Sequence, residues 1–280
     1  MPEGSSLASL RRRVGTDTLV AAGFLALLSL VALAAPLVSP YPPSATLDIV
    51  NLRAQGPTFA HPFGTDLASR DLLSRVIYGA RTSLAVALLA VLLSTTLGTA
   101  YGMVAGYAGG IIDTVLMRAL DGLMAIPRIL LLIVLLSYWE KGATAVILGI
   151  GFTGWFTIAR LVRAEVLAAK PRDYVSAAIA LGAARRRIVL RHILPNVIGP
   201  ATVAATVAVA HVIALEAGLA FLGFGAPTAH ASWGAIILDG YGAFAQFWWI
   251  PLFPGLAILA TALAFNVVGD GLRDVIAGRR

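Results

Sequence analysis

Few side chains in this sequence could carry out covalent chemistry. The 280 residues include no cysteine, and the four histidines lie far apart along the chain. No segment reads G-x-x-x-x-G-K-[ST], the loop whose lysine and backbone amides hold the phosphates of ATP. The H-E-x-x-H zinc motif and the G-x-S-x-G nucleophile motif are also missing from the sequence. The chain is therefore not predicted to be an enzyme, and we expect it to bind no cofactor or metal ion of its own.

Four ionisable residues stand out because they fall within apolar stretches, namely Asp121, Arg128, His211 and Glu216. An ionisable group inside a membrane is costly and usually faces a cavity or a partner. Asp121 and Arg128 are seven residues apart, which predicts one shared helix face, and Arg118 could pair with Asp121. A local ion pair thus competes with a pathway role for these charges. For His211 and Glu216, a capping or interhelical hydrogen bond competes with a proton relay.

The composition places these residues in a membrane protein. Hydrophobic residues make up 59% of the chain, charged residues only 12%, and the mean hydropathy is +0.86. Soluble domains carry about 25% charged residues, so an ordinary soluble enzyme is excluded. A helix crosses the bilayer core in about 20 apolar residues. The sequence predicts an all-α integral membrane protein with six spans, at 18–38, 82–106, 113–137, 142–162, 197–220 and 250–271.

Basic residues are distributed unevenly around these spans. Fifteen Lys and Arg residues fall on one side and five on the other. An excess of positive charge marks the cytoplasmic side, so both termini are predicted to be cytoplasmic. A cleaved signal peptide is the alternative for the first span. The predicted order is a cytoplasmic N-terminus 1–17, a first span 18–38, an external loop 39–81, a five-helix core 82–272 with a cytoplasmic loop 163–196, and a cytoplasmic tail 273–280.

One predicted span carries a ridge of small residues. Gly98, Gly102 and Gly106 are spaced four residues apart, so they lie on one side of a helix. Such spacing lets two helix backbones approach closely in lipid, where helix association relies on packing. Chance is the alternative, because glycine is common in membrane helices.

The cytoplasmic loop 163–196 contains a pattern for two short helices. Asp173 is predicted to cap the first helix, and Gly182 to end it. A second helical piece is predicted over Arg185–His192, closed by Pro195. The first helix has nothing of its own to pack on, so we expect it to lie on the membrane or to dock on another protein. Tyr174, Ala177, Ala178 and Leu181 are spaced so that they form one apolar face of this first helix.

The segment SAAIALGAARRRIVLRHILPN at 176–196 resembles the EAA loop in permease subunits of binding-protein-dependent ABC importers. Ala177, Ala178, Gly182 and Pro195 match the spacing of that pattern, with Ser176 in place of its glutamate. In that family the loop forms coupling helices that enter a cleft of the ATPase subunit. The resemblance therefore implies coupling to an ATPase through Asp173, Tyr174, Ala177, Ala178, Leu181, Gly182, Arg185, Arg191, His192 and Pro195.

Three further stretches, at 61–84, 216–227 and 254–274, resemble the dipeptide, oligopeptide and nickel class of these permeases, in the same order along the chain. The resemblance implies the type I importer fold (MetI-like) and the shorter, second permease of such a system. It also implies a partner permease, two ATPase subunits that bind ATP and Mg²⁺, an external solute-binding protein and an inner-membrane location, with no nucleic acid partner. Peptides are the expected substrate, with nickel as the alternative. A self-contained secondary transporter or channel remains the rival function.

Overall fold

The computed structural model describes residues 15–140, 142–225 and 232–278. Within these ranges the chain is helical, apart from loops and one isolated β-bridge between Thr65 and Asp71. The helices are α2 (Thr16–Leu33), α3 (Ala35–Val38), α4 (Leu72–Ala108), α5 (Gly110–Met124), α6 (Arg128–Tyr138), α7 (Ala143–Ala169), α8 (Asp173–Ala180), α9 (Arg185–Ile188), the π-helix η1 (Val189–Ile193), α10 (Leu194–Leu219), the π-helix η2 (Ala220–Phe224), α11 (Trp233–Tyr241) and α12 (Trp249–Ile276).

Five helical stretches in the described ranges are long and apolar enough to cross a membrane: α2, α4, α7, the continuous run Arg185–Phe224 and α12. The third predicted span falls on α5 and α6, which are long and apolar enough only when taken together and are bent by 81° at the break between them. The predicted all-helical membrane fold is thereby confirmed. The break follows from Pro127, which has no N–H to continue the helix and disfavours helical geometry in the residue before it.

This break corrects one expectation about the charged residues. Asp121 lies in α5 and Arg128 is the first residue of α6, so the two side chains share no helix face. The seven-residue spacing would have aligned them only along one uninterrupted helix.

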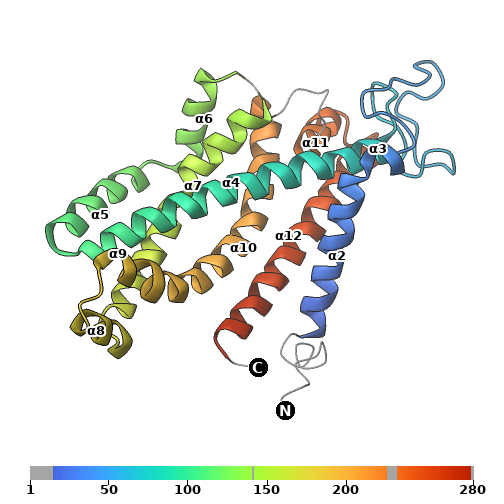
Figure 1. The fold of residues 1–280 in the computed structure, drawn as a ribbon. Coiled ribbons are helices and arrows are strands. Elements are labelled where there is room, and N and C mark those ends of the chain that lie inside the picture. Colours follow the sequence, from blue (N-terminus) through green and yellow to red (C-terminus); the bar gives the residue numbers. More distant parts are fainter. Residues whose placement is uncertain (1–14, 141, 226–231, 279–280) are drawn as a thin grey trace, which may run out of the picture.

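Figure 1 shows how the helices are arranged. The beginning of α2 and the end of α12 lie at the same end of the molecule as α8, whereas α3 and α11 lie at the opposite end. Helix α4 crosses the molecule between these ends and begins ten residues before the predicted span. Asp71 explains that early start, because its carboxylate accepts a hydrogen bond from the Ser74 backbone N–H at 2.8 Å. At 1.5 Å per residue α4 is about 55 Å long, so it extends beyond the hydrocarbon layer.

The glycine ridge of α4 packs directly against α7, which confirms the predicted close approach. A Cβ atom on Gly98 would lie 2.8 Å from the Trp155 carbonyl oxygen, and one on Gly102 would overlap the Ala159 carbonyl oxygen. The third glycine of the ridge meets α7 in the same way. Because only hydrogen fits at these points, the glycines hold α4 and α7 at a backbone-to-backbone contact.

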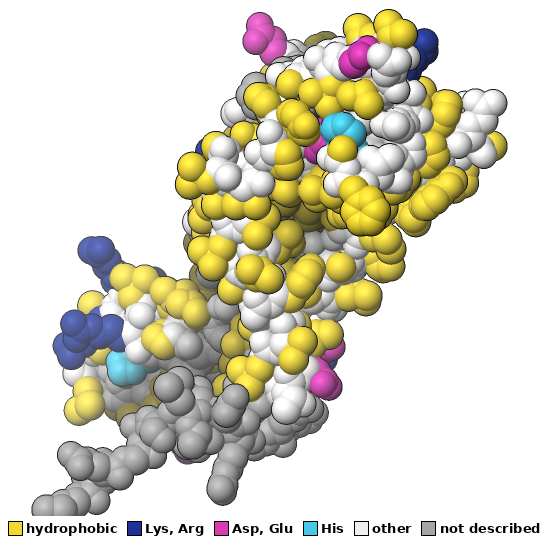
Figure 2. Space-filling model, turned by 90° about the vertical axis from the view of Figure 1, so that its right-hand side faces the viewer, with side chains coloured by type: hydrophobic (Ala, Val, Ile, Leu, Met, Phe, Trp, Pro, Cys, Tyr) yellow, Lys and Arg dark blue, Asp and Glu magenta, His cyan; other side chains and the backbone are white. Residues whose placement is uncertain are grey.

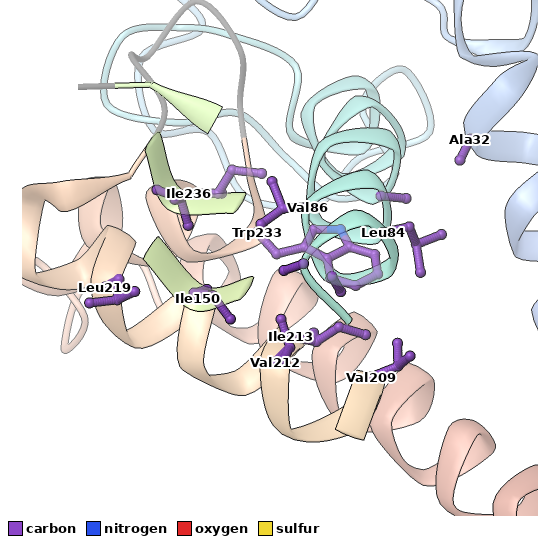
Figure 3. Close-up of a cluster of buried hydrophobic side chains, with 14 of the residues drawn as sticks. Ala32, Leu84, Val86, Ile150, Val209, Val212, Ile213, Leu219, Trp233 and Ile236 are labelled. Atoms are coloured by element: carbon purple, nitrogen blue, oxygen red, sulfur yellow. The ribbon is translucent and has the colours of Figure 1, made fainter. Parts of the chain in front are cut away.

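A buried tryptophan anchors α11 to the membrane helices. Trp233 is fully buried, and its indole N–H donates to the Val76 carbonyl oxygen of α4 at 3.0 Å. Figure 3 shows its ring among side chains of α4 and α10, including Leu84 and Ile213. This contact fixes the segment between α10 and α12 against the bundle.

A buried ion-pair cluster ties the loop before α4 to the rest of the molecule. Arg75 has no exposed surface and contacts Asp66 at 2.5 Å and Asp239 of α11 at 2.8 Å. Arg70 joins the same two carboxylates at 2.7 and 2.9 Å. Because Asp66 comes from the loop and Asp239 from α11, the cluster connects the loop and the start of α4 to a helix 164 residues further along the chain.

The surface agrees with a protein embedded in a bilayer. Figure 2 shows one face of the molecule on which hydrophobic side chains dominate the middle and charged side chains lie mostly toward the two ends. Many large apolar residues of the spans are exposed, for example Leu92 at 63% and Leu30 at 63%. Such exposure suits helices that contact lipid.

Candidate coupling surface and membrane cavity

Helix α8 begins at Asp173 itself, whereas a cap at Asp173 would require the helix to begin one residue later. The Arg172 carbonyl oxygen already accepts from the Val175 and Ser176 N–H groups, at 2.9 and 3.1 Å. Arg172 is therefore the N-cap residue, and no side chain caps the helix. Asp173 instead lies in the first turn, where a carboxylate interacts favourably with the helix dipole. The expectation of a capping role for Asp173 is wrong.

One side of α8 packs on its own chain, which corrects the expectation that it has nothing to pack on. Val175 and Ala178 are buried in a cluster with Ile188, Ile193 and Val197. Tyr174 packs partly against the same cluster. The reason is that the chain turns back after α8, so that α9 and the start of α10 cover its inner side.

The predicted apolar face of α8 is therefore divided between two sides. Ala177 and Leu181 are exposed, Leu181 at 87%, whereas Ala178 is buried. Ile179 is exposed at 57% beside them. The helix thus presents apolar side chains outward even after its inner side is covered.

Gly182 ends α8 in the left-handed conformation that the sequence predicts. Its φ is +73°, a value that a side chain disfavours. Its N–H donates to the Ile179 carbonyl oxygen at 2.9 Å, and the Ala183 N–H donates to the Ala178 carbonyl oxygen at 3.0 Å. These two bonds are the Schellman pattern of a helix C-terminus.

The predicted helical piece Arg185–His192 exists, but Pro195 does not close it. It is built from α9 and η1, and the helix continues without interruption into α10. The Leu194 N–H donates to the Val189 carbonyl oxygen, five residues back, as in a π-helix. Pro195 follows this π-turn as the second residue of α10, inside the continuous helical run.

Basic side chains accompany the outward apolar residues. Arg185 and Arg191 are exposed, His192 is half-buried and Pro195 is exposed. Figure 2 shows Lys and Arg side chains gathered on a lobe at the lower end of the molecule, the end at which α8 and α9 lie in Figure 1. We refer to one set of exposed residues as the coupling surface: Ala177, Ile179, Leu181, Arg185, Arg186, Arg187 and Arg191.

A cavity of about 530 Å³ opens between the middle parts of α4, α7 and α10 and the start of α6. Its polar lining residues are Ser94, Arg128, Thr157 and His211, and no carboxylate from the described part of the chain lines it. The structure thus brings together two predicted site residues, Arg128 and His211, that are 83 positions apart in the sequence. The apolar lining residues are Ile158, Leu161, Ala204, Val207, Ala208 and Val212, together with Gly154.

Asp121 pairs with a residue other than the one predicted. Its carboxylate accepts from the Arg160 guanidinium of α7 at 2.6 Å, and both side chains are half-exposed. Arg118 forms no ion pair with Asp121. Helix α5 lies beside α7, so the Asp121 carboxylate pairs with Arg160 instead. The local pair expected from spacing alone is therefore replaced by an interhelical pair.

Glu216 lies apart from the cavity. It is 3% exposed, and its carboxylate accepts from the Ser83 hydroxyl of α4 at 3.1 Å. The Ser83 oxygen in turn accepts from the Trp233 backbone N–H at 3.2 Å. The interhelical hydrogen bond expected for Glu216 is confirmed. Among the described residues, His211 bonds within its own helix, to the Val207 carbonyl oxygen at 3.2 Å, and forms no relay with Glu216.

Two groups of polar residues escaped the sequence reasoning. The buried cluster around Arg75 lies in segments that the pattern assigned to loops, namely 39–81 and the stretch between the spans 197–220 and 250–271. Ser94 and Thr157 line the cavity but carry no charge, so they did not stand out in apolar runs. A search for Ser and Thr on the predicted helix faces would have found the second pair.

The family of the chain follows from comparison with known proteins. Residues 98–280 match the family described as binding-protein-dependent transport system inner membrane component. The oligopeptide transport system permease protein OppC of Bacillus subtilis is 38% identical over 269 residues, which cover 96% of this chain and 88% of that protein. OppC of Escherichia coli is 38% identical over 277 residues, covering 98% and 92%. The dipeptide transport system permease protein DppC of Bacillus subtilis is 38% identical over 268 residues, covering 95% and 83%.

Solved structures agree on the fold. A chain from an inward-facing form of the MetNI methionine ABC transporter superposes with a TM-score of 0.59 at 21% identity, covering 73% of this chain and 96% of that chain. A chain from an amino acid ABC transporter crystallised with histidines gives 0.55 at 15% identity, covering 71% and 92%. With the helical membrane fold, the family match and the permease relatives all in agreement, the chain belongs to the inner membrane components of binding-protein-dependent transport systems, as a permease of the ABC importer type.

Proposed function

We propose that this chain forms half of the membrane pathway of an ATP-driven importer of dipeptides or oligopeptides. The substrate class is supported by its relatives, which are named oligopeptide and dipeptide transport permeases and match over nearly their whole length. The second half of the pathway comes from a partner permease, so the membrane unit is a heterodimer. An external binding protein delivers the peptide, and two ATPase subunits hold ATP and Mg²⁺.

The structural support for this proposal comes from the coupling surface. Helix α8 is held on its inner side by a buried cluster and ends in a fixed turn, yet it presents Ile179 and Leu181 outward beside several arginines. A rigidly held helix with an apolar outer side is suited to a groove on another protein. Through it, closure of the ATPases would move α8 and, by the continuous helix from Arg185, the spans around the cavity.

The orientation that this function requires puts α8 in the cytoplasm. Both ends of the described chain lie at the same end of the molecule as α8, so they are proposed to be cytoplasmic as well. The excess of basic residues on that side supports the same orientation. The loop that contains the Arg75 cluster then faces the binding protein.

Reconstitution in liposomes tests the function. The purified chain alone should show no ATPase activity and no saturable nucleotide binding, because it has no phosphate-binding loop. Peptide uptake should appear only when the partner permease, the ATPases and the binding protein are present, and it should require ATP. Uptake by the chain alone under an imposed pH gradient would contradict the proposal and favour a secondary transporter.

A further inference from the structure

The cavity between α4, α6, α7 and α10 has an unusual electrostatic character for a site within a membrane. Among the described residues, its ionisable lining residues are Arg128 and His211, and none is acidic. Both side chains are exposed on the surface of this single chain. A charged group in a membrane-spanning segment is costly unless it is paired or serves a pathway. The question is therefore what neutralises Arg128.

The protein provides only neutral partners for Arg128 within residues 15–140, 142–225 and 232–278. The guanidinium donates to the Thr153 hydroxyl at 3.3 Å and to the Ile150 carbonyl oxygen at 3.2 Å. By contrast, Arg160 and Arg163 of α7 each pair with a carboxylate of α5, at 2.6 and 2.5 Å. The bonds to Thr153 and Ile150 engage the Nε and one terminal nitrogen of Arg128. A guanidinium has five N–H donors, so donors of Arg128 remain free.

The position of Arg128 also favours the binding of an anion. It is the first residue of α6, directly after the break at Pro127, so it lies at the positive end of that helix dipole. It also lines a second cavity of about 270 Å³ next to the break, which shares Gly154 and Thr157 with the larger one. Arg128 thus stands between two adjacent spaces along the bundle.

His211 of α10 lines the same cavity. Its Nδ1 lies 3.2 Å from the Val207 carbonyl oxygen, which can only accept, so Nδ1 carries the hydrogen. Nε2 is then the nitrogen that remains for a ligand. Ser94 and Thr157 add hydroxyl groups that can donate or accept.

We infer that this cavity is a transient binding site for the peptide in transit, in which Arg128 holds the C-terminal carboxylate. This inference rests on the proposed function and names the contact that the peptide makes. A terminal carboxylate is present on every peptide whatever its side chains, and a guanidinium binds a carboxylate with two parallel hydrogen bonds. The volume of about 530 Å³ lies within the range of cavities that hold small molecules. The apolar remainder of the lining accommodates peptide side chains without selecting among them.

Equilibrium binding to the complete importer in nanodiscs tests this inference. The importer is used without its binding protein and without ATP, so that only the membrane site is measured. The probes are radiolabelled dialanine and its C-terminal amide, which differ only in the carboxylate. The wild-type complex should bind the acid about tenfold more tightly than the amide, because a charge-assisted pair is lost with the amide. Arg128→Gln should reduce this ratio to about twofold or less.

Two variants act as controls. Arg118→Gln removes the same charge from exposed α5 outside the cavity, and it should leave the ratio unchanged. Arg128→Lys keeps the charge without the planar fork, so its ratio should fall between those of wild type and Arg128→Gln. If the Arg128→Gln complex does not assemble, the test uses Arg128→Lys alone. An unchanged ratio of acid to amide binding in Arg128→Lys would then overturn the inference.

The remaining outcomes separate the inference from the proposed function. ATP-driven uptake is measured with the same complexes and the binding protein. If wild type imports dialanine but binds the acid and the amide equally, the carboxylate site is wrong while the importer function stands. An unchanged ratio in Arg128→Gln leads to the same conclusion, as would be found if a carboxylate of the partner permease neutralises Arg128. If no peptide is imported at all, both proposals fail.

Discussion

At the scale of single residues, the structure separates charges that hold the protein together from charges that remain available. Arg75 is fully buried between Asp66 and Asp239, whereas Arg160 and Asp121 pair on a half-exposed surface. A buried charge that loses its partner is strongly destabilised, while an exposed pair contributes little because water and salt screen it.

The Arg75 cluster therefore predicts a large difference between two arginine variants. Arg75→Met should lower the free energy of unfolding by about 3 kcal/mol, because Asp66 and Asp239 lose a buried partner. Arg160→Met should change it by about 0–1 kcal/mol. Thermal denaturation of the detergent-solubilised complex measures both. Equal effects of the two variants would mean that the cluster is not buried in the assembled protein.

The glycine ridge gives a second prediction at this scale. Gly102→Ala would place a methyl group on the Ala159 carbonyl oxygen, so α4 and α7 must move apart. We expect a loss of about 1–3 kcal/mol in stability, as for an overpacked core. Gly23→Ala in α2 is the matched control, because a Cβ there meets nothing within 4 Å. A shift of the melting temperature in Gly102→Ala but not in Gly23→Ala is the expected result.

At the scale of elements, α8 and its turn act as one unit. The buried residues of α8 hold it against the start of α10, and the Schellman turn at Gly182 sets the direction in which the chain leaves it. A substitution at the turn should therefore change the orientation of the coupling surface without affecting insertion of the spans.

Gly182→Val tests that expectation. Valine resists a φ of +73°, so the turn must rearrange, and ATP-driven uptake should fall much more than the amount of protein in the membrane. Gly182→Asn is the control, since asparagine tolerates left-handed geometry, and it should retain more activity. Uptake is compared with immunoblots of membranes and with the amount of ATPase that copurifies. A valine variant with normal uptake and a normal share of bound ATPase would reject the coupling role of this turn.

At the scale of the whole molecule, the two ends differ in what they present. One end combines the beginning of α2 and the end of α12 with α8 and exposed arginines, and the other combines α3, α11 and the loop tied by the Arg75 cluster. This difference between the ends predicts which parts face the cytoplasm.

Cysteine labelling checks the orientation directly, because the chain has no cysteine of its own. Ala60→Cys lies on the exposed loop before α4 and should react with an impermeant thiol reagent in intact cells. Ala180→Cys lies on exposed α8 and should react only after lysis. Labelling of Ala180→Cys in intact cells would invert the proposed orientation.

The sequence by itself determined the features that depend on local composition and spacing. A backbone inside a membrane is satisfied in helices or in a closed barrel, and continuous apolar runs of helix length favour helices, so the all-helical fold followed from the composition and its distribution along the chain. The turn at Gly182 and the contact of the glycine ridge followed from residues whose conformation or size leaves few alternatives. The resemblance of 176–196 to the EAA loop identified the family before any packing was known.

The tertiary structure decided which faces meet. Periodicity shows that a helix has an apolar side but not what covers it, so only the folded chain shows that Val175 and Ala178 are buried beneath α8. The break at Pro127 separates Asp121 from Arg128, and helix packing then places Arg128 beside a cavity with His211. Such neighbours are set by contacts between segments far apart in the chain, and spacing along a single helix carries no information about them.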